Sequence, residues 1–179
     1  SSGPPIWIAA RDPNSHEFAV ENNCNVQVTP LWQDYEEVEV LIARFRAAQT
    51  KCQNQYQSKI MLLQHTFVSK TEDELEHAAK LFSKFYSHFG AWFKNERPVD
   101  QALMKKLSDD EIKALEMYSP AIMKNNLAIG NSMEVIDRLK KYEALGYDEF
   151  AYWIDSGMSF DMKKTSLERF INEVMPAFH

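Results

Sequence analysis

Short apolar runs alternate along the chain with longer segments in which apolar residues recur every three or four positions. The runs predict buried strands, which we place at 6–10, 25–29, 59–69, 127–130 and 149–155. The longer segments predict helices, which we place at 16–23, 35–50, 71–92, 131–145 and 166–178. This alternation is typical of parallel strands joined by right-handed crossovers. It fits an open doubly wound sheet or part of a (β/α)8 barrel, and the pattern does not separate the two.

Three helix starts carry a capping signal, in which a polar residue is followed three positions later by glutamate. These pairs are Thr71 with Glu74, Ser108 with Glu111, and Asn131 with Glu134. The pair at Ser108 lies inside the stretch 94–126, where the alternation of strands and helices breaks. We therefore expect this stretch to be a helical insertion rather than a disordered segment.

Composition and charge narrow the class of protein. The 179 residues are 45% hydrophobic and 26% charged, as in a soluble globular protein, and the net charge is −6 without a Lys/Arg stripe. We expect no nucleic-acid partner. No apolar run reaches the length of a membrane span and no secretory signal is present, so we expect a cytoplasmic protein. Cys24 and Cys52 form no C-x-x-C pair and are expected to be reduced. The sequence holds no metal-binding motif, so we expect no metal, and no catalytic residue is assigned.

The chain begins Ser1-Ser2-Gly3 without an initiator methionine, as in the remnant of an expression tag. The first predicted strand follows almost at once, at Ile6. We expect residues 4–179 to form a single domain and the natural protein to continue on the N-terminal side.

Four stretches together resemble one known family. They read PPIWIAARDPNSHEFAVENNCNVQVTP, MLLQHTFVSKTEDELEHAA, AIGNSMEVIDRLKKYEALGYDEFAYWID and LERFINEVMPAF. Over residues 4–178 the chain is similar to the C-terminal half of the luciferase-like flavin-dependent monooxygenases. The family usually has Thr or Ser followed by Pro after the glycine at 130. Here Asn131, Ser132 and Met133 stand in that place, a departure that keeps the chemistry of the helix cap.

The resemblance implies an α/β fold of parallel (β/α) units that form about half of a TIM-type (β/α)8 barrel. This chain would supply strands five to eight, with the helical insertion near 94–126, and would lack strands one to four. That would explain why the sequence opens directly on a strand.

The resemblance also implies an oxidoreductase, an FMN-dependent monooxygenase that oxidises an organic substrate with O2 and reduced flavin. A separate flavin reductase would supply the reduced FMN, and a homodimer is expected. The chain has no nicotinamide-binding fingerprint, which agrees with that division of labour. The alternative is a catalytically inactive half-barrel, whose open strand edges would make it a self-associating structural or binding module.

By this resemblance the flavin phosphate contacts Ala10, Arg11, Asp12 and Ser15, and Thr29 lies along the flavin. Arg11 suits bidentate hydrogen bonding to phosphate, and Ser15 stands at a helix start, where free N–H groups favour anions. Asp12 argues against the site because its carboxylate repels phosphate. The alternative is that Asp12 or Ser15 caps the helix while Arg11 is solvated.

A second, weaker phosphate candidate is the stretch Gly130-Asn131-Ser132, because barrels often bind phosphate after strands seven and eight. Candidates for the pocket of the substrate or flavin ring are His65, Trp153, Asp155 and Met158. A hydrogen-bonded core histidine and a packed tryptophan are the alternatives for the first two.

The long helix that begins near Thr71 carries a stripe of large aromatic residues: Phe82, Phe85, Phe89, Trp92 and Phe93. This spacing predicts packing in the core or at an interface. Because the stripe leads into the insertion, the alternative is that it walls a hydrophobic substrate pocket.

Overall fold

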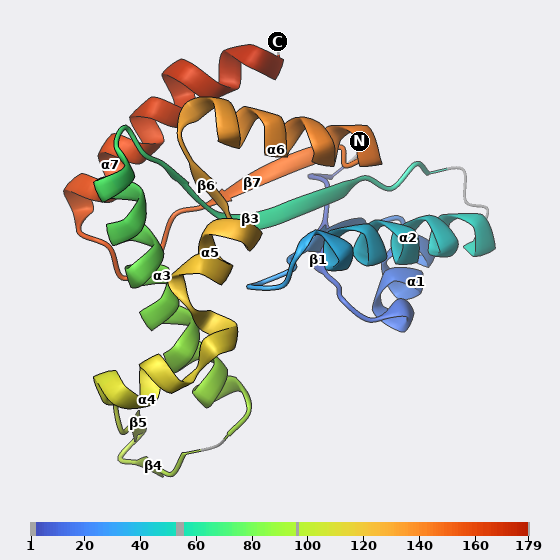
Figure 1. Cartoon of the computed structure of the whole chain (residues 1–179). Coiled ribbons are helices and arrows are strands. Elements are labelled where there is room, and N and C mark those ends of the chain that lie inside the picture. The colour runs from blue at the N-terminus through green and yellow to red at the C-terminus, as the bar shows by residue number, and fades with distance from the viewer. Residues whose placement is uncertain (1–2, 53–55, 96, 179) are drawn as a thin grey trace. The chain divides into compact units, whose positions relative to one another are not determined.

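Parallel strands alternate with helices in the computed structural model, which describes residues 3–52, 56–95 and 97–178 (Figure 1). The chain divides into two compact units, Ser1–His65 with Ile136–Trp153, and Thr66–Val135 with Ile154–His179. Strand β3 (Ile60–Val68) begins in the first unit and ends in the second, and helix α6 (Ser132–Leu145) leads back into the first. Among the described residues, no helix has both the length and the apolar character that crossing a membrane requires.

The first unit is built on a parallel sheet. Its neighbouring strands are, in order, β1 (Trp7–Ala9), β2 (Asn25–Val28), β3 and β7 (Glu149–Trp153). Helix α1 (Pro13–Glu21) connects β1 to β2, and α2 (Tyr35–Cys52) connects β2 towards β3. The predicted alternation of parallel strands and helices is confirmed here.

The prediction of a buried first strand is correct for Ala10 and wrong for residues 6–9. Ile6 is 61% exposed, Trp7 and Ile8 are half-buried, and Ala9 is exposed. Within the described residues β1 pairs with β2 alone, so it forms an edge of the sheet. An apolar run therefore identified the strand correctly but not its burial, because burial depends on what lies beyond the edge.

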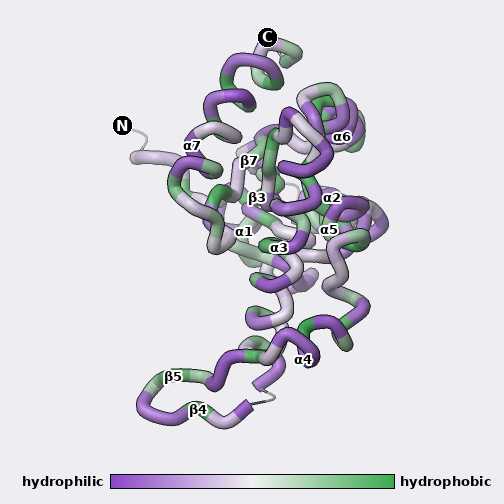
Figure 2. Tube along the Cα trace, turned by 60° about the vertical axis from the view of Figure 1, so that its left-hand side comes forward, coloured by the Kyte–Doolittle hydropathy of each residue, from purple (hydrophilic) through white to green (hydrophobic). Residues whose placement is uncertain are grey.

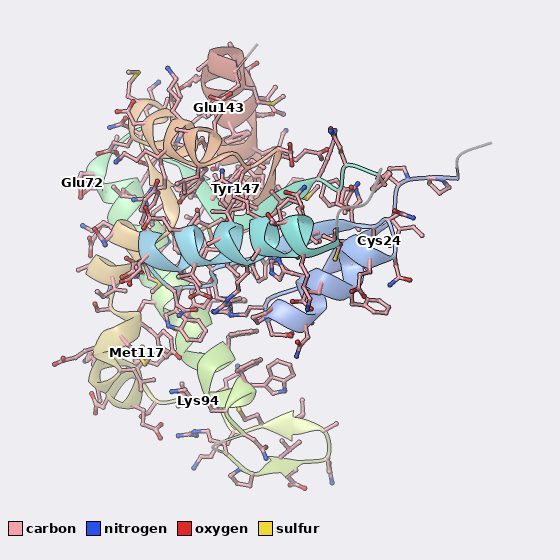
Figure 3. The ribbon with its side chains drawn as sticks, turned by 90° about the vertical axis from the view of Figure 1, so that its right-hand side faces the viewer. Cys24, Glu72, Lys94, Met117, Glu143 and Tyr147 are labelled. Atoms are coloured by element: carbon pink, nitrogen blue, oxygen red, sulfur yellow. The ribbon has the colours of Figure 1, made fainter. Side chains whose placement is uncertain are left out.

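The core of the first unit lies between α2 and the central strands. α2 buries Leu41 and Phe45, which are one helical turn apart, and the sheet buries Val26, Ile60 and Leu62. Each such side chain stabilises the fold by about 1.5–3 kcal/mol. Tyr147, which lies beside α2 in Figure 3, donates its hydroxyl to the carbonyl oxygen of Val38 at 2.8 Å. Burial raises the pKa of Tyr147, which keeps this hydroxyl protonated.

Two further details complete the first unit. Tyr142 on α6 donates its hydroxyl to Oε1 of Gln64 on β3 at 2.8 Å, which satisfies a buried amide. Gly146 follows α6 with a φ of 93°, a left-handed conformation that ends the helix at the predicted position. Cys24, labelled in Figure 3, and Cys52 are both free thiols.

The second unit contains the end of β3, paired in parallel with β6 (Ala128–Gly130), and the segments between these two strands. These are α3 (Glu72–Phe93) and the predicted insertion at 94–126, which holds β4 (Val99–Asp100), β5 (Leu103–Met104), α4 (Asp109–Ala114), η1 (Glu116–Tyr118) and α5 (Pro120–Asn126). The insertion contains helices, as predicted, but β4 and β5 also form a short antiparallel hairpin. Figure 2 shows hydrophobic and hydrophilic residues interleaved along these segments.

The predicted helix caps are present in this unit. Ser108 and Glu111 form a reciprocal capping box at α4. Thr71 Oγ1 accepts from the backbone N–H of Glu74, but the Glu74 carboxylate accepts from the N–H of Lys70 rather than that of Thr71. The cap at α3 therefore has the expected residues, but the Glu74 carboxylate bonds to a different backbone N–H.

The C-terminal helix starts earlier than the sequence predicts. α7 spans Phe160–Arg169, and the chain continues as η2 (Phe170–Val174) and η3 (Met175–Phe178). Ser159 caps α7, where the prediction placed the start near 166. Arg169 on α7 donates to the Glu74 carboxylate at 2.6 and 3.3 Å and to the carbonyl oxygen of Val68 at 3.2 Å. These contacts tie α7 to the segment where β3 ends and α3 begins.

Candidate functional site

The loop after β1 holds Arg11 in a network of acceptors. Its Nη2 donates to Glu37 at 2.9 Å and to Oε1 of Gln33, and its Nη1 lies 3.5 Å from the carbonyl oxygen of Thr29. The Arg11 side chain is still 41% exposed. The neighbouring acceptors thus orient the guanidinium, while some of its N–H donors face solvent. This corrects the alternative that Arg11 is only solvated.

Asp12 is the N-cap of α1, as the alternative interpretation expected. Its carboxylate accepts from the backbone N–H of Ser15 at 3.1 Å and from the Ser15 hydroxyl. These bonds lower the pKa of Asp12, so the carboxylate is charged at neutral pH. α1 begins at Pro13 rather than near His16, because proline suits the first helical turn.

Arg11 is therefore the residue through which this loop fits a phosphate. The donors at the start of α1 already serve the Asp12 carboxylate, which occupies the place that an external anion would need. Ala10 is buried, and its N–H donates to the carbonyl oxygen of Gln27. Thr29 is half-buried, and its hydroxyl accepts from the N–H of Leu31 at 3.1 Å.

The stretch Gly130-Asn131-Ser132 does not fit a phosphate. Oδ1 of Asn131 accepts from the N–H groups of Met133 and Glu134, and the Glu134 carboxylate accepts from the N–H of Asn131. The hydroxyl of Ser132 donates to a carboxylate oxygen of Glu173. The Asn131 amide oxygen and two carboxylates thus take the donors that would attract an anion.

Two of the four pocket candidates lie in each unit, and the structure brings His65 and Trp153 together. In the first unit, the His65 and Trp153 rings are stacked, with centroids 3.9 Å apart and an angle of 16°. His65 is fully buried and Trp153 half-buried. In the second unit, Met158 is buried, whereas Asp155 is exposed and lies 3.4 Å from Nζ of Lys163.

The aromatic stripe of α3 is divided between core and surface. Phe82 is buried, Phe85 and Phe89 are half-buried, and Trp92 and Phe93 are 61% and 65% exposed. The sequence predicts packing in the core or at an interface, and among the stripe residues burial in the core is found for Phe82 alone. The helix instead buries a face with small residues, including Ser83, Ser87 and Gly90, and this face allows close packing against Tyr118.

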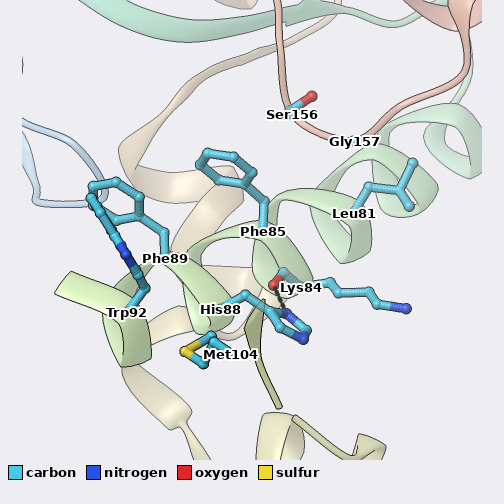
Figure 4. Close-up of a pocket in the computed structure, with 9 residues that line it drawn as sticks. All are labelled: Leu81, Lys84, Phe85, His88, Phe89, Trp92, Met104, Ser156 and Gly157. Carbon is cyan, nitrogen blue, oxygen red and sulfur yellow. Dashed lines mark hydrogen bonds between the residues drawn. The ribbon is translucent and has the colours of Figure 1, made fainter. Parts of the chain in front are cut away.

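The half-exposed rings line a groove of about 520 Å³ in the second unit (Figure 4). The side chains that line it are Leu81, Lys84, Phe85, His88, Phe89, Trp92, Met104 and Ser156, together with Gly157. Sequence reasoning found its aromatic wall but missed Lys84, His88, Met104 and Ser156. Met104 and Ser156 come from segments distant in sequence, so no local pattern could have found them.

His88 connects two segments of this groove through both ring nitrogens. Its Nδ1 lies 2.8 Å from the carbonyl oxygen of Lys84, and its Nε2 accepts from the N–H of Leu107 at 3.2 Å. A carbonyl can only accept, so Nδ1 donates the first of these hydrogen bonds. His88 thus joins α3 to the segment before α4.

Comparison with known proteins defines the class. The family model of the luciferase-like monooxygenases matches residues 1–149, so the chain belongs to this family. Monooxygenase RslO1 from Streptomyces bottropensis shares the fold, with a TM-score of 0.66 at 16% identity, over 98% of this chain and 49% of that one. The coenzyme F420-dependent tetrahydromethanopterin reductase from Methanopyrus kandleri gives a TM-score of 0.68 at 15% identity, over 98% and 51%. The predicted fold class, about half of a (β/α)8 barrel, is confirmed.

A curated relative is much more similar in sequence. The oxygenase component of the flavin-dependent trigonelline monooxygenase from Acinetobacter baylyi (strain ATCC 33305 / BD413 / ADP1) is 59% identical over 175 residues. The match covers 98% of this chain and 49% of the relative. The chain thus spans about half the length of the curated relative that it matches.

Proposed function

We propose that this chain forms part of the oxygenase component of a two-component, FMN-dependent monooxygenase. The observation that carries the proposal is the 59% identity, over nearly the whole chain, with the oxygenase component of a flavin-dependent monooxygenase. The proposal concerns the complete protein, since the chain spans about half of that relative. Within it, the flavin supplies the electrons with which O2 is split, one oxygen atom entering the substrate and the other leaving as water.

We propose that the substrate is trigonelline or a close analogue. Trigonelline is a planar N-methylpyridinium ring that carries a carboxylate, so it combines a cationic aromatic ring with an anionic group. The name of the relative supports this choice. Aromatic side chains are well suited to a ring of this kind because their faces attract cations.

In this proposal Arg11 contacts the flavin phosphate. Its guanidinium is already oriented by Glu37 and keeps solvent-facing donors that a phosphate oxygen can accept. Thr29, whose carbonyl oxygen lies near the same guanidinium, would border the flavin. The stacked pair of His65 and Trp153 would give the ring system a rigid wall on the side of β3 and β7.

The partner in this proposal is a flavin reductase that delivers reduced FMN. The description of the relative as an oxygenase component supports a separate reducing partner. A homodimer and a cytoplasmic location belong to the same proposal.

The test is O2 consumption and trigonelline loss by the complete protein, supplied with FMN, a flavin reductase and its nicotinamide donor. We expect trigonelline to disappear only when the reductase and FMN are both present. Benzoate in place of trigonelline is the control for uncoupled O2 consumption. Absence of trigonelline loss, with reduced FMN demonstrably supplied, would reject the proposed substrate.

A further inference from the structure

Arg44 on α2 contacts two residues of the network around the loop after β1. Its Nη1 donates to the carbonyl oxygen of Arg11 at 2.7 Å and lies 4.0 Å from Oε1 of Glu37. Glu37 and Arg44 are seven positions apart, which is about two helical turns, so they lie on the same face of α2. Both side chains reach Arg11, in the loop that leads into α1, and α1 packs beside α2 (Figure 1).

Arg11 is thereby held at its backbone and at its side chain. Arg44 holds the backbone carbonyl oxygen, while the Glu37 carboxylate accepts from the guanidinium at 2.9 Å. All three residues lie in the first unit, and their mutual contacts are made within this chain. A side chain that is already oriented loses less conformational freedom when it takes up a ligand, which favours binding.

Arg44 also changes the charge that a phosphate meets at this loop. The loop and the side chains in ionic contact with it carry two carboxylates, those of Asp12 and Glu37. With Arg11 as the one cation, this group would be negative overall and would repel a phosphate. Arg44 makes the positive and negative charges equal in number. His16 adds no charge at neutral pH, because burial and the nearby Arg44 lower its pKa.

We propose that Arg44 is a positioning residue for flavin binding, which acts through Arg11 by fixing its carbonyl oxygen and by sharing the Glu37 carboxylate. The inference rests on the proposed function, in which Arg11 contacts the phosphate of FMN. Arg44 makes no contact with the flavin in this assignment. Its contribution therefore concerns the phosphate alone, and it favours FMN over riboflavin, which has the same ring system and ribityl chain without a phosphate.

The experiment measures the dissociation constants of FMN and riboflavin for the complete protein at pH 8, by flavin fluorescence. At this pH the phosphate is a dianion and His16 is neutral. Arg44→Met should raise the FMN dissociation constant about fivefold to tenfold and leave that of riboflavin unchanged. A loss of equal size for both flavins would mean that Arg44 supports only the fold, and would overturn the assignment.

Arg46→Met is the matched control. Arg46 lies on the same helix and also donates to a backbone carbonyl oxygen, that of Leu145 at the end of α6. This variant therefore loses the same charge and the same kind of hydrogen bond, but no contact with the loop. Its preference for FMN over riboflavin should match that of the wild type. If Arg46→Met lowers this preference as much as Arg44→Met does, the effect comes from overall charge and the assignment falls.

A conservative variant and a double variant test whether the effect passes through Arg11. Arg44→Lys keeps the charge without the planar guanidinium, so it should lose less FMN affinity than Arg44→Met and no riboflavin affinity. It gives the same contrast between the two flavins if Arg44→Met does not fold. In a protein that already carries Arg11→Gln, Arg44→Met should cause little further loss of FMN binding. If the two losses add in full, Arg44 acts independently of Arg11 and the assignment is wrong.

The outcomes separate this assignment from the proposed function. If Arg11→Gln weakens FMN binding and Arg44→Met does not, Arg11 contacts the phosphate as proposed and the role of Arg44 is rejected. If Arg11→Gln leaves FMN binding unchanged, the phosphate placement in the proposed function is wrong, and the role of Arg44 falls with it.

Discussion

Arg11 donates to Glu37 across 2.9 Å, and this ion pair joins the loop after β1 to the first turn of α2. The contact orients the guanidinium and at the same time balances its charge. Arg44 lies 4.0 Å from the same carboxylate and donates to the carbonyl oxygen of Arg11 at 2.7 Å. Because the Glu37 carboxylate contacts both arginines, the share of it that neutralises Arg11 determines how much positive charge Arg11 offers to a phosphate.

Removing Arg11 should weaken flavin binding to the complete protein. Arg11→Gln loses a charge-assisted contact, and we expect the FMN dissociation constant to rise about tenfold. Glu37→Gln is the matched variant, since it frees the guanidinium and should leave binding unchanged or tighter. Titration followed by flavin fluorescence measures both. Equal dissociation constants in the wild type and Arg11→Gln would exclude Arg11 as a phosphate ligand.

Asp12→Ser should keep the helix cap while removing the negative charge beside the proposed phosphate site. Serine is as good an N-cap as aspartate, so the melting temperature should change little. FMN should bind more tightly because the repulsion is gone. Asp12→Ala is the control, with the same charge removed and the cap lost, and it should melt at a lower temperature. A weaker affinity for FMN in Asp12→Ser would contradict the placement of the phosphate.

Gly90→Ala should destabilise the protein although alanine favours helices. A Cβ at this position would lie 2.2 Å from the Tyr118 hydroxyl oxygen, and Tyr118 is fully buried. Overpacking of this kind costs about 1–3 kcal/mol, which exceeds the roughly 1 kcal/mol that alanine gains in a helix. Urea unfolding measures the difference. Tyr118→Phe in the same background should recover part of the loss, and additive effects would argue against this clash.

Stability should fall as the pH drops below 6.5 because of His16. The side chain is fully buried, and neither ring nitrogen has a hydrogen-bond partner in the described residues. Burial and the nearby Arg44 lower the pKa of His16 below 6.5, partly offset by Asp12. The unfolded chain then takes up the proton first, so acid favours unfolding.

His16→Leu should remove this contribution. The difference in urea midpoint between the variant and the wild type should grow in favour of the variant from pH 7.5 to pH 5. A difference independent of pH would show that folding does not change the pKa of His16.

The local pattern of residues was sufficient to predict much of the fold. The run at 60–68 is apolar and β-branched enough to identify β3 almost to the residue, and Ser108 with Glu111 identified α4 through its cap. The start of α7 was missed because Ser159 follows a glycine-containing loop and lacks the glutamate that completes a capping box. Such a cap is visible only once the backbone around it is known.

The candidate site was predicted less well because it depends on partners far apart in sequence. The hydrophobic stripe of α3 predicted packing of its rings in the core or at an interface, yet the helix buries Ser87 and Gly90, and Gly90 lies against Tyr118. Small residues allow another helix or strand to approach closely, and a pattern of hydrophobic residues alone does not predict this. The single domain and the homodimer stay predictions, as does contact of residues 10–15 with the flavin.

β3 pairs with β2 through residues 60–62 and has two further partner strands along its length. Residues 61–65 pair with β7, and residues 66–68 pair with β6. Because side chains alternate between faces at every step, the two sets of hydrogen bonds keep their register only if the strand has a fixed number of residues. Substitutions can accumulate along β3 during evolution, but a gained or lost codon would put one set of pairings out of step with the other. Length variation in this gene should therefore be found in the insertion and not in β3.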